Sequence, residues 1–431
     1  MIGIGLIVVA SLCLLILGMW IPFVLALAGM GLLIAFKGIA GLNAVGFVTW
    51  NAVTNFTLTA IPLYILMAEL LLRSGLSNRL YRGLNRLTRV LPGGLLQTNI
   101  AGCAVFAAVS GSSVTTAATI GSVALPELQR RGYPMRMAYG SLAAGGSLGI
   151  LIPPSIPLIV YGALVEASVV KLFLAGIVPG LLLALLFMAF VATAFWRRSP
   201  ISEPVAAEAA EDESQDSLQR TLLDILPTLS VIAVVLVSLY GGWATPTEAA
   251  AVGCAIGLIF ALFYGGLTFE SLRSAVQSAV SFSAIMLFIV VAAMVFSYAV
   301  TITGAGRMVT DVVLSLELSK TSFLVVLILV FAVLGCLLES MSMVVITVPL
   351  LLPALVSYDI DKIWFGIFLM IMIELGQLTP PLGINLFVIQ GISSAKFQDV
   401  AVGALPYCVL IVAFTLAIIM FPHIALWLPN L

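Results

Sequence analysis

The sequence has few charged side chains. Asp, Glu, Lys and Arg make up 9% of the 431 residues, against 62% hydrophobic residues, and the mean hydropathy is +1.22. A soluble domain usually carries about 25% charged residues, and a chain this apolar would expose large apolar patches in water. The composition therefore predicts an all-α polytopic membrane protein, because each helical span needs roughly 20 apolar residues.

Several chemical groups are scarce or missing. The only histidine is His423, and the five cysteines stand singly in apolar runs, so there is no His-Glu-x-x-His site and no pair with metal-ligand spacing. The sequence has no Gly-Lys-Ser/Thr phosphate loop and no basic patch for nucleic acid. An ATP-driven pump within this chain and a nucleic-acid partner are excluded, and an intramembrane enzyme is disfavoured.

Basic residues predict the orientation of the chain. They form three clusters: Arg73, Arg79, Arg82, Arg86 and Arg89; Arg130, Arg131 and Arg136; and Arg197 with Arg198. The positive-inside rule places all three in the cytoplasm, and we expect the first cluster, residues 73–89, to form a cytoplasmic loop. Residues 95–128 between the first two clusters are apolar, so an even number of crossings is needed there. One re-entrant hairpin that enters and leaves on the cytoplasmic side satisfies this. The apolar N-terminal segment lacks the positive start of a signal peptide, so we expect it to be mature structure.

The two halves of the sequence resemble each other. A shift of 227 residues pairs four prolines, Pro126, Pro153, Pro154 and Pro179, with Pro353, Pro380, Pro381 and Pro406. Roughly 0.4 such pairs are expected by chance, so the shift marks an internal repeat. Near the start the shift is 224, which a short insertion explains.

The repeat predicts the domain organisation. We expect a first repeat over residues 1–198, an acidic cytoplasmic linker over 199–220, and a second repeat over 221–431. An odd number of crossings in each half inverts the second, so its hairpin, near 321–356, opens to the periplasm and both chain termini are periplasmic. Inverted repeats with broken helices are a transporter architecture.

Two Pro-Pro pairs, Pro153-Pro154 and Pro380-Pro381, interrupt apolar segments. Proline lacks an N–H, so in a helix the pairs would free the carbonyls of Gly149 and Ile150, and of Gly376 and Gln377. Freed carbonyls inside a bilayer need a partner, and a dehydrated Na⁺ is a suitable one. A simple kink in a packed helix is the alternative; the repetition of the motif favours binding.

The predicted hairpin tips, Ser110-Gly-Ser-Ser113 and Glu339-Ser-Met-Ser342, supply hydroxyls and unpaired carbonyls. A helix starting after Ser112-Ser113 points N–H groups at the tip, which suits a carboxylate. Among acidic residues in apolar context, Glu339 is the strongest candidate for function. Glu69 and Glu374 are further candidates, whereas Glu127 is expected to pair with basic residues and Glu248 to cap a helix.

Three stretches resemble the large membrane subunit of tripartite ATP-independent periplasmic (TRAP) transporters. They are residues 108–121 around the first tip, Gly145-Gly-Ser-Leu-Gly-Ile-Leu-Ile-Pro-Pro-Ser-Ile-Pro157, and Glu374-Leu-Gly-Gln-Leu-Thr-Pro-Pro-Leu-Gly-Ile-Asn385. The resemblance covers nearly the whole chain. It implies an elevator-type, Na⁺-coupled secondary transporter for organic anions in the bacterial inner membrane.

The resemblance also implies partners and site residues. The partners are a small four-helix membrane subunit, here a separate chain, and a periplasmic substrate-binding protein. Two Na⁺ sites, made mostly of backbone carbonyls, map onto Ala108, Ser110, Gly149, Ile152 and Pro154, and onto Gly335, Gly376, Thr379 and Leu382. We expect the substrate to contact Ser112, Ser113, Glu339, Ser340, Thr379 and Asn385.

A stand-alone ion-coupled carrier or antiporter without a binding protein is the main alternative, and only the family motifs favour the tripartite system over it. The sequence does not identify the substrate. Dicarboxylates, sugar acids, sialic acids and zwitterions all remain open.

Overall fold

The computed structural model describes residue 14 and residues 17–196, 218–264 and 267–431. Within these ranges every regular element is a helix, and seven helices are long and apolar enough to cross a membrane, or eight if the bent pair Ala305–Ser315 and Lys320–Gly335 is one span. The all-helical membrane class is confirmed. Most of the predicted N-terminal apolar segment, and linker residues 199–217, lie outside the described residues.

The described helices of the first half are α2 (Ile21–Lys37), η1 (Ile39–Leu42), α3 (Asn43–Val53), η2 (Phe56–Thr59), α4 (Ala60–Arg73), α5 (Leu76–Thr88), α6 (Leu95–Ser110), α7 (Ser113–Arg130), α8 (Met135–Ser147), η3 (Leu148–Ile150), α9 (Ile156–Val165) and α10 (Val169–Trp196). Those of the second half are α12 (Leu218–Tyr240), α13 (Pro246–Tyr264), α14 (Phe269–Thr303), α15 (Ala305–Ser315), α16 (Lys320–Gly335), α17 (Ser340–Ser357), α18 (Lys362–Leu378), α19 (Ile384–Ser393), α20 (Phe397–Met420), α21 (His423–Leu426) and η5 (Leu428–Asn430).

Both halves follow the same order of elements. A short helix (α5 or α15) precedes two helices joined by a brief break (α6–α7 or α16–α17), then an interrupted helix (α8–α9 or α18–α19) and one long helix (α10 or α20). The inversion of the second half stays a prediction. Because α12 begins at Leu218, the last three residues of the predicted linker are helical.

The basic segment after α4 was expected to be a loop, and this expectation is wrong. Residues Leu76–Thr88 form α5, which packs on α12 and α6. Its leucines recur every four residues, so one face is apolar and buried while the arginines lie around it. Arg86 and Arg79 reach Asp224 of α12, at 3.0 and 3.9 Å. Helix α3, which is too polar at Asn43 and Asn51 for an obvious apolar run, was also missed.

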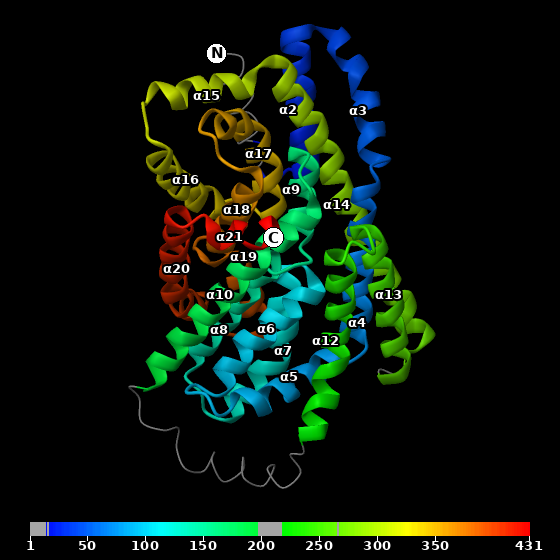
Figure 1. The fold of residues 1–431 in the computed structure, drawn as a ribbon, viewed down its shortest axis with the longest axis vertical. Helices are drawn as coiled ribbons and strands as arrows, with labels where there is room; N and C mark the ends of the chain where they lie inside the picture. Colours follow the sequence, from blue (N-terminus) through cyan, green and yellow to red (C-terminus); the bar gives the residue numbers. More distant parts are fainter. Residues whose placement is uncertain (1–13, 15–16, 197–217, 265–266) are drawn as a thin grey trace.

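Figure 1 shows two groups of helices side by side. In the first, the long helix α14 packs along α2 and α4, and α13 packs along α4. In the second, which holds both breaks, α8 packs on α20 and α16 packs on α18. The elevator mechanism would move the second group against the first, and it stays a prediction.

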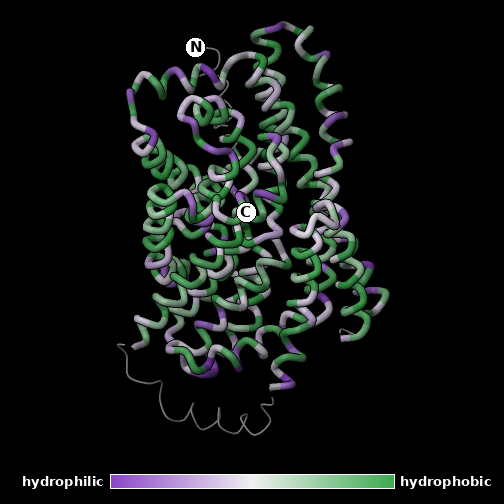
Figure 2. The backbone as a smooth tube through the Cα atoms, in the orientation of Figure 1, coloured by the Kyte–Doolittle hydropathy of each residue, from purple (hydrophilic) through white to green (hydrophobic). Residues whose placement is uncertain are grey.

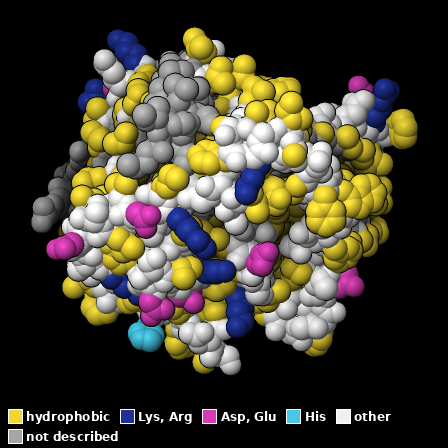
Figure 3. All heavy atoms as spheres, turned by 90° about the horizontal axis from the view of Figure 1, so that it is seen from above, with side chains coloured by type: hydrophobic (Ala, Val, Ile, Leu, Met, Phe, Trp, Pro, Cys, Tyr) yellow, Lys and Arg dark blue, Asp and Glu magenta, His cyan; other side chains and the backbone are white. Residues whose placement is uncertain are grey.

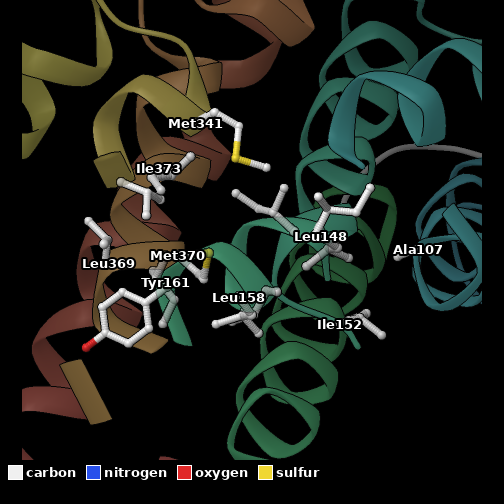
Figure 4. Packing of buried hydrophobic residues seen from close by; sticks show 14 of the residues in the cluster. Ala107, Leu148, Ile152, Leu158, Tyr161, Met341, Leu369, Met370 and Ile373 are labelled. Atoms are coloured by element: carbon white, nitrogen blue, oxygen red, sulfur yellow. The ribbon is translucent and has the colours of Figure 1, made fainter. Parts of the chain in front are cut away.

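Helix α18 forms the centre of the second group. Every residue from Trp364 to Leu378 is buried, as expected for a helix that is apolar all round. Figure 4 shows Leu369, Met370 and Ile373 of α18 in one apolar layer with Leu158 and Tyr161 of α9. This layer joins the two halves of the sequence.

Polar residues gather at the two ends of the long axis, with an apolar band between them (Figure 2). At the end that carries α15, acidic and basic side chains are interspersed, with apolar side chains around the rim (Figure 3). The opposite end carries α5 and its arginines. This asymmetry agrees with a cytoplasmic α5 under the positive-inside rule.

The orientation can be tested by labelling with a membrane-impermeant thiol reagent in intact cells, in a variant without the native cysteines. A cysteine in place of exposed Glu317, between α15 and α16, should be labelled, whereas one in place of exposed Arg82 on α5 should react only after lysis. The reverse pattern would show that the chain is inserted the other way up.

Helices α8 and α20 cross so closely that a side chain at Gly403 would collide with the backbone carbonyl of Arg136. We expect Gly403→Ala to lower the free energy of unfolding by about 1–3 kcal/mol, the usual cost of overpacking. Gly391→Ala on α19 is the matched control, because a Cβ there meets no atom within 4 Å. Unfolding temperatures in detergent would measure both; equal temperatures would contradict the crossing.

Candidate functional site

The two predicted hairpin tips meet at one cavity of about 360 Å³. Ser112 and Ser113 line it from the α6–α7 break, and Glu339 and Ser340 line it from the α16–α17 break. Four of the six predicted substrate residues are therefore brought together, although they lie more than 220 positions apart in the chain. The cavity size is within the range of small-molecule sites.

The opposite wall of the cavity comes from the other group of helices and is apolar. Phe282, Ile285, Met286 and Ile289 of α14 line it, together with Trp20 before α2. The sequence patterns gave no signal for this wall, because apolar residues on α14 look the same whether they face lipid or a cavity.

The other two predicted substrate residues, Thr379 and Asn385, do not line this cavity. Asn385 is fully buried, and its Nδ2 donates to the carbonyl of Ala143 and to Gln377 Oε1, both at 3.3 Å. Gln377 Nε2 in turn donates to Ser340 Oγ at 2.5 Å. Asn385 thus acts on the second tip through Gln377, and the only sequence signal for Gln377 was a polar residue in an apolar run.

The first tip is fixed by its own hydrogen bonds. The Thr115 N–H donates to Ser112 Oγ at 3.5 Å, which caps α7. The Ser112 carbonyl accepts from the Thr116 N–H at 3.1 Å and from Thr116 Oγ1 at 2.8 Å, so this tip carbonyl is paired, against expectation. Ser110 Oγ lies 2.6 Å from Thr116 Oγ1. Gly111 turns the chain in the left-handed region, at φ 59°.

The second tip differs from the first in charge. Its N-cap residue is Glu339, and Ser342 Oγ donates to Glu339 Oε2 at 3.4 Å. A carboxylate of the chain itself therefore lies at the start of α17. A negative group is favourable there because it offsets the partial positive charge of the helix N-terminus.

The first group of predicted Na⁺ residues lies where the first tip meets the first Pro-Pro break. A Cβ at Gly149 would lie 2.6 Å from the Ser112 carbonyl oxygen, and one at Gly111 would lie 2.7 Å from the Pro154 carbonyl oxygen. Ala108 and Ser110 end α6 at the same tip, and Ile152 lies inside the break. The five predicted Na⁺ residues, Ala108, Ser110, Gly149, Ile152 and Pro154, are all buried.

Of the two carbonyls that were expected to be free at this break, that of Gly149 is unpaired within the described ranges and that of Ile150 is paired. In the described chain, no N–H or hydroxyl donates to the carbonyls of Gly149 or Ala108. The Ile150 carbonyl accepts from Ser155 Oγ at 2.5 Å, so it is paired. Oxygen ligands of this kind suit a hard cation, and the buried, orphaned carbonyls fit the predicted Na⁺.

The second group lies at the contact between the end of α16 and α18. A Cβ at Gly335 would lie 2.5 Å from the Gly376 Cα. The Gly376 carbonyl was expected to be free but accepts from the Thr379 N–H at 3.3 Å, because the helix tightens in its last turn. Gly335 and Leu382 also line a second cavity of about 240 Å³, so this group is the more open one.

Glu374 is fully buried on α18, and neither carboxylate oxygen has a hydrogen-bond partner among the described residues. Such a carboxyl is costly inside a protein, so Glu374 remains a candidate without an assigned role.

The other three acidic residues have ordinary partners. Glu69 Oε2 lies 3.3 Å from Arg73 Nε. Glu127 pairs with Arg130 and Arg131 as expected. Burial alone would raise the pKa of Glu127, but the hydrogen bonds from these two arginines leave this pKa below its usual value. Glu248 accepts from the Thr245 N–H at 2.8 Å and caps α13 as expected.

A family model described as the tripartite ATP-independent periplasmic transporter, DctM component, matches residues 8–424. The C4-dicarboxylate TRAP transporter large permease protein DctM of Vibrio cholerae is 32% identical, over 98% of this chain and 98% of that protein. The Pseudomonas aeruginosa protein of the same description is 33% identical over 87% of each chain. The isethionate TRAP transporter permease protein DctMQ of Oleidesulfovibrio alaskensis is 32% identical over 96% of this chain, which spans 64% of that longer protein.

Solved structures with a similar fold are membrane transporters of low sequence identity. The Alcanivorax borkumensis YdaH transporter superposes with a TM-score of 0.64 at 16% identity, over 89% of each chain. Neisseria gonorrhoeae MtrF, described as one of a class of antimetabolite efflux pumps, gives a TM-score of 0.62 at 14% identity, over 91% of this chain and 85% of that one. These likenesses concern the fold alone.

The contact between Gly149 and the first tip can be tested directly. Gly149→Ala would push a methyl group against the Ser112 carbonyl, so we expect the tip to shift and uptake in reconstituted vesicles to fall at least tenfold. Gly46→Ala on α3 is the control, because a Cβ there meets nothing within 4 Å. Wild-type uptake by Gly149→Ala would show that this contact is not part of the site.

Proposed function

This chain belongs to the DctM family, the large membrane component of the tripartite ATP-independent periplasmic transporters, and from this premise we propose that it is the translocating subunit of a Na⁺-coupled importer of an organic anion. As its relatives are transporter permeases, the chain is a secondary transporter and not an enzyme. The observation that carries the proposal is the meeting of the two tips at one cavity. In each half a close glycine contact also joins the hairpin to the interrupted helix that follows it, between Gly149 and Ser112 in the first half and between Gly335 and Gly376 in the second.

Two backbone clusters would hold Na⁺. Ala108, Ser110, Gly149, Ile152 and Pro154 would form the first, and Gly335, Gly376, Thr379 and Leu382 the second. When bound, Na⁺ would supply positive charge beside a cavity that no Lys or Arg of the described chain lines. The chain itself would hold the anion: Ser112 and Ser113 would present their hydroxyls and the α7 N-terminus to it. The apolar wall of α14 would exclude water.

The anion class is supported by the relatives' names, which mention C4-dicarboxylates, sialic acid and isethionate. We propose an elevator movement of the group that contains both breaks, in the bacterial inner membrane with both termini periplasmic. The partners would be a small four-helix membrane subunit and a periplasmic binding protein. A stand-alone carrier would differ in taking up substrate without the binding protein.

Coupling can be measured in proteoliposomes that contain this chain, the small subunit and the binding protein. Uptake should require an inward Na⁺ gradient and no ATP, and it should vanish when external Na⁺ is replaced by K⁺. Undiminished uptake in K⁺, or uptake that follows a proton gradient alone, would reject Na⁺ as the coupling ion. Uptake without the binding protein would favour the stand-alone carrier.

Two substitutions at the second break separate a main-chain ligand from a side-chain ligand. The Gly376 carbonyl accepts one hydrogen bond from the Thr379 N–H at 3.3 Å, which leaves its second lone pair for a cation. Pro380→Ala supplies an N–H that can compete for this lone pair in helical geometry, so the Na⁺ concentration for half-maximal uptake should rise about tenfold. Thr379→Val removes a hydroxyl that already donates to the Leu375 carbonyl at 2.7 Å, and it should have the smaller effect. A larger effect of Thr379→Val would identify the hydroxyl as the main ligand. If Pro380→Ala has no effect on the Na⁺ dependence of uptake, the prolines only kink the helix and do not prepare a carbonyl ligand.

A further inference from the structure

The cavity carries information about the substrate itself, and this inference rests on the proposed function. We propose that the substrate is an amphipathic monocarboxylate, with its single acidic group at the N-terminus of α7 and its apolar body against α14 and Trp20. Three features of the lining carry the proposal: one available helix terminus, one fixed carboxylate, and one apolar wall.

The start of α7 is the place for the acidic group. Ser112, Ser113 and Val114 all line the cavity, and the N–H groups of Ser113 and Val114 have no acceptor among the described residues. Orphan N–H donors at a helix N-terminus, beside two serine hydroxyls, bind a carboxylate well.

The start of α17 is not equivalent, and this excludes a second acidic group. Glu339 already brings a carboxylate to that terminus and lines the same cavity. Among the described residues, no Lys or Arg lines the cavity to offset a second negative charge. A dicarboxylate would place its second carboxylate toward Glu339, and two negative charges at short range repel strongly where water is scarce.

The wall opposite the tips determines the rest of the molecule. The side chains of Phe282, Ile285, Phe288 and Ile289 offer no hydrogen-bond donor or acceptor, and Met286 offers only a weakly accepting sulfur. The hydroxyls of a sugar acid would lose water against this wall without gaining a partner, which is unfavourable. An alkyl or aromatic group gains from the same burial.

The proposal separates this chain from relatives named for C4-dicarboxylates. It can be tested on the purified complex of this chain with its small subunit, by ligand-induced changes in unfolding temperature and in tryptophan fluorescence in Na⁺ buffer. Trp20 lines the cavity and can report on occupancy. The three probes are 4-methyl-2-oxopentanoate, succinate and gluconate.

We expect 4-methyl-2-oxopentanoate to bind at least tenfold more tightly than succinate or gluconate. Glu339→Gln should narrow the difference in affinity between 4-methyl-2-oxopentanoate and succinate, because it removes the negative charge of the side chain while keeping its shape. Succinate or gluconate binding as tightly as the branched acid in the wild type would overturn the proposed substrate class.

A pair of substitutions on α14 tests the wall. Ile285→Ser should weaken binding of 4-methyl-2-oxopentanoate at least threefold, whereas Val280→Ser, an exposed position outside the cavity on the same helix, should not change it. If Ile285→Ser leaves affinity unchanged and only slows uptake, the wall is a sliding surface and the proposal is wrong.

The Na⁺ response distinguishes the two levels of failure. If Na⁺ alone raises the unfolding temperature but succinate is preferred, the substrate class fails and the proposed function stands. If neither Na⁺ nor any of the acids in Na⁺ alters the protein differently from K⁺, the proposed function fails as well.

Discussion

The obligation to satisfy backbone polar groups away from water governs this structure. A helix satisfies its backbone N–H and carbonyl groups internally, so the apolar segments of the described chain are helical. Every break in a helix leaves backbone groups unpaired, and these groups need another hydrogen-bond partner or a bound ion. At the first break Ser155 Oγ satisfies the Ile150 carbonyl, while the carbonyls of Gly149 and Ala108 have no donor in the described chain. At the second break the Thr379 N–H turns back to the Gly376 carbonyl. The carbonyls of Gly149 and Ala108, which are unpaired within the described ranges, lie where the first tip meets the first break, and a cation would be stabilised there.

Features encoded by proline and glycine were predictable from the sequence. Pro153-Pro154 and Pro380-Pro381 end their helices because proline removes a donor, and Gly111 permits the left-handed turn at the first tip. Features that depend on the identity of a distant neighbour were not predictable. Helix α5 was read as a loop because its charge outweighed its leucine period, and its partner Asp224 lies 138 residues from Arg86. The link from Asn385 through Gln377 to Ser340 was missed for the same reason, since it joins three elements whose contact appears only in three dimensions.

The two halves follow one order of elements, yet they have diverged where they meet the cavity. Ser112 caps α7 with a neutral hydroxyl, whereas Glu339 stands at the equivalent position before α17. The first break is buried throughout, whereas Leu382 in the second is 47% exposed and borders its own cavity. A repeated backbone therefore presents one end suited to an anion and another that already holds a negative charge. The repeat thus gives both halves the same backbone arrangement at the cavity, and the difference between Ser112 and Glu339 determines which helix N-terminus an anion would face.

In the proposed function, a glycine contact would connect the ion site to the substrate site. The Ser112 carbonyl that packs on Gly149 belongs to the residue that caps α7 and lines the cavity. Any ligand that shifts the Gly149 carbonyl must therefore shift Ser112, and any ligand that fixes Ser112 must restrict Gly149. Such a coupling is reciprocal, because the free energy by which one ligand favours the other is the same in both directions. It needs no side chain between the two sites. Because Gly149 has no side chain, its backbone packs directly on the backbone of Ser112 and Ser113, and no flexible group absorbs a displacement. Close backbone packing can thus link the proposed ion binding to the proposed substrate binding, although no basic residue of the described ranges lines the cavity.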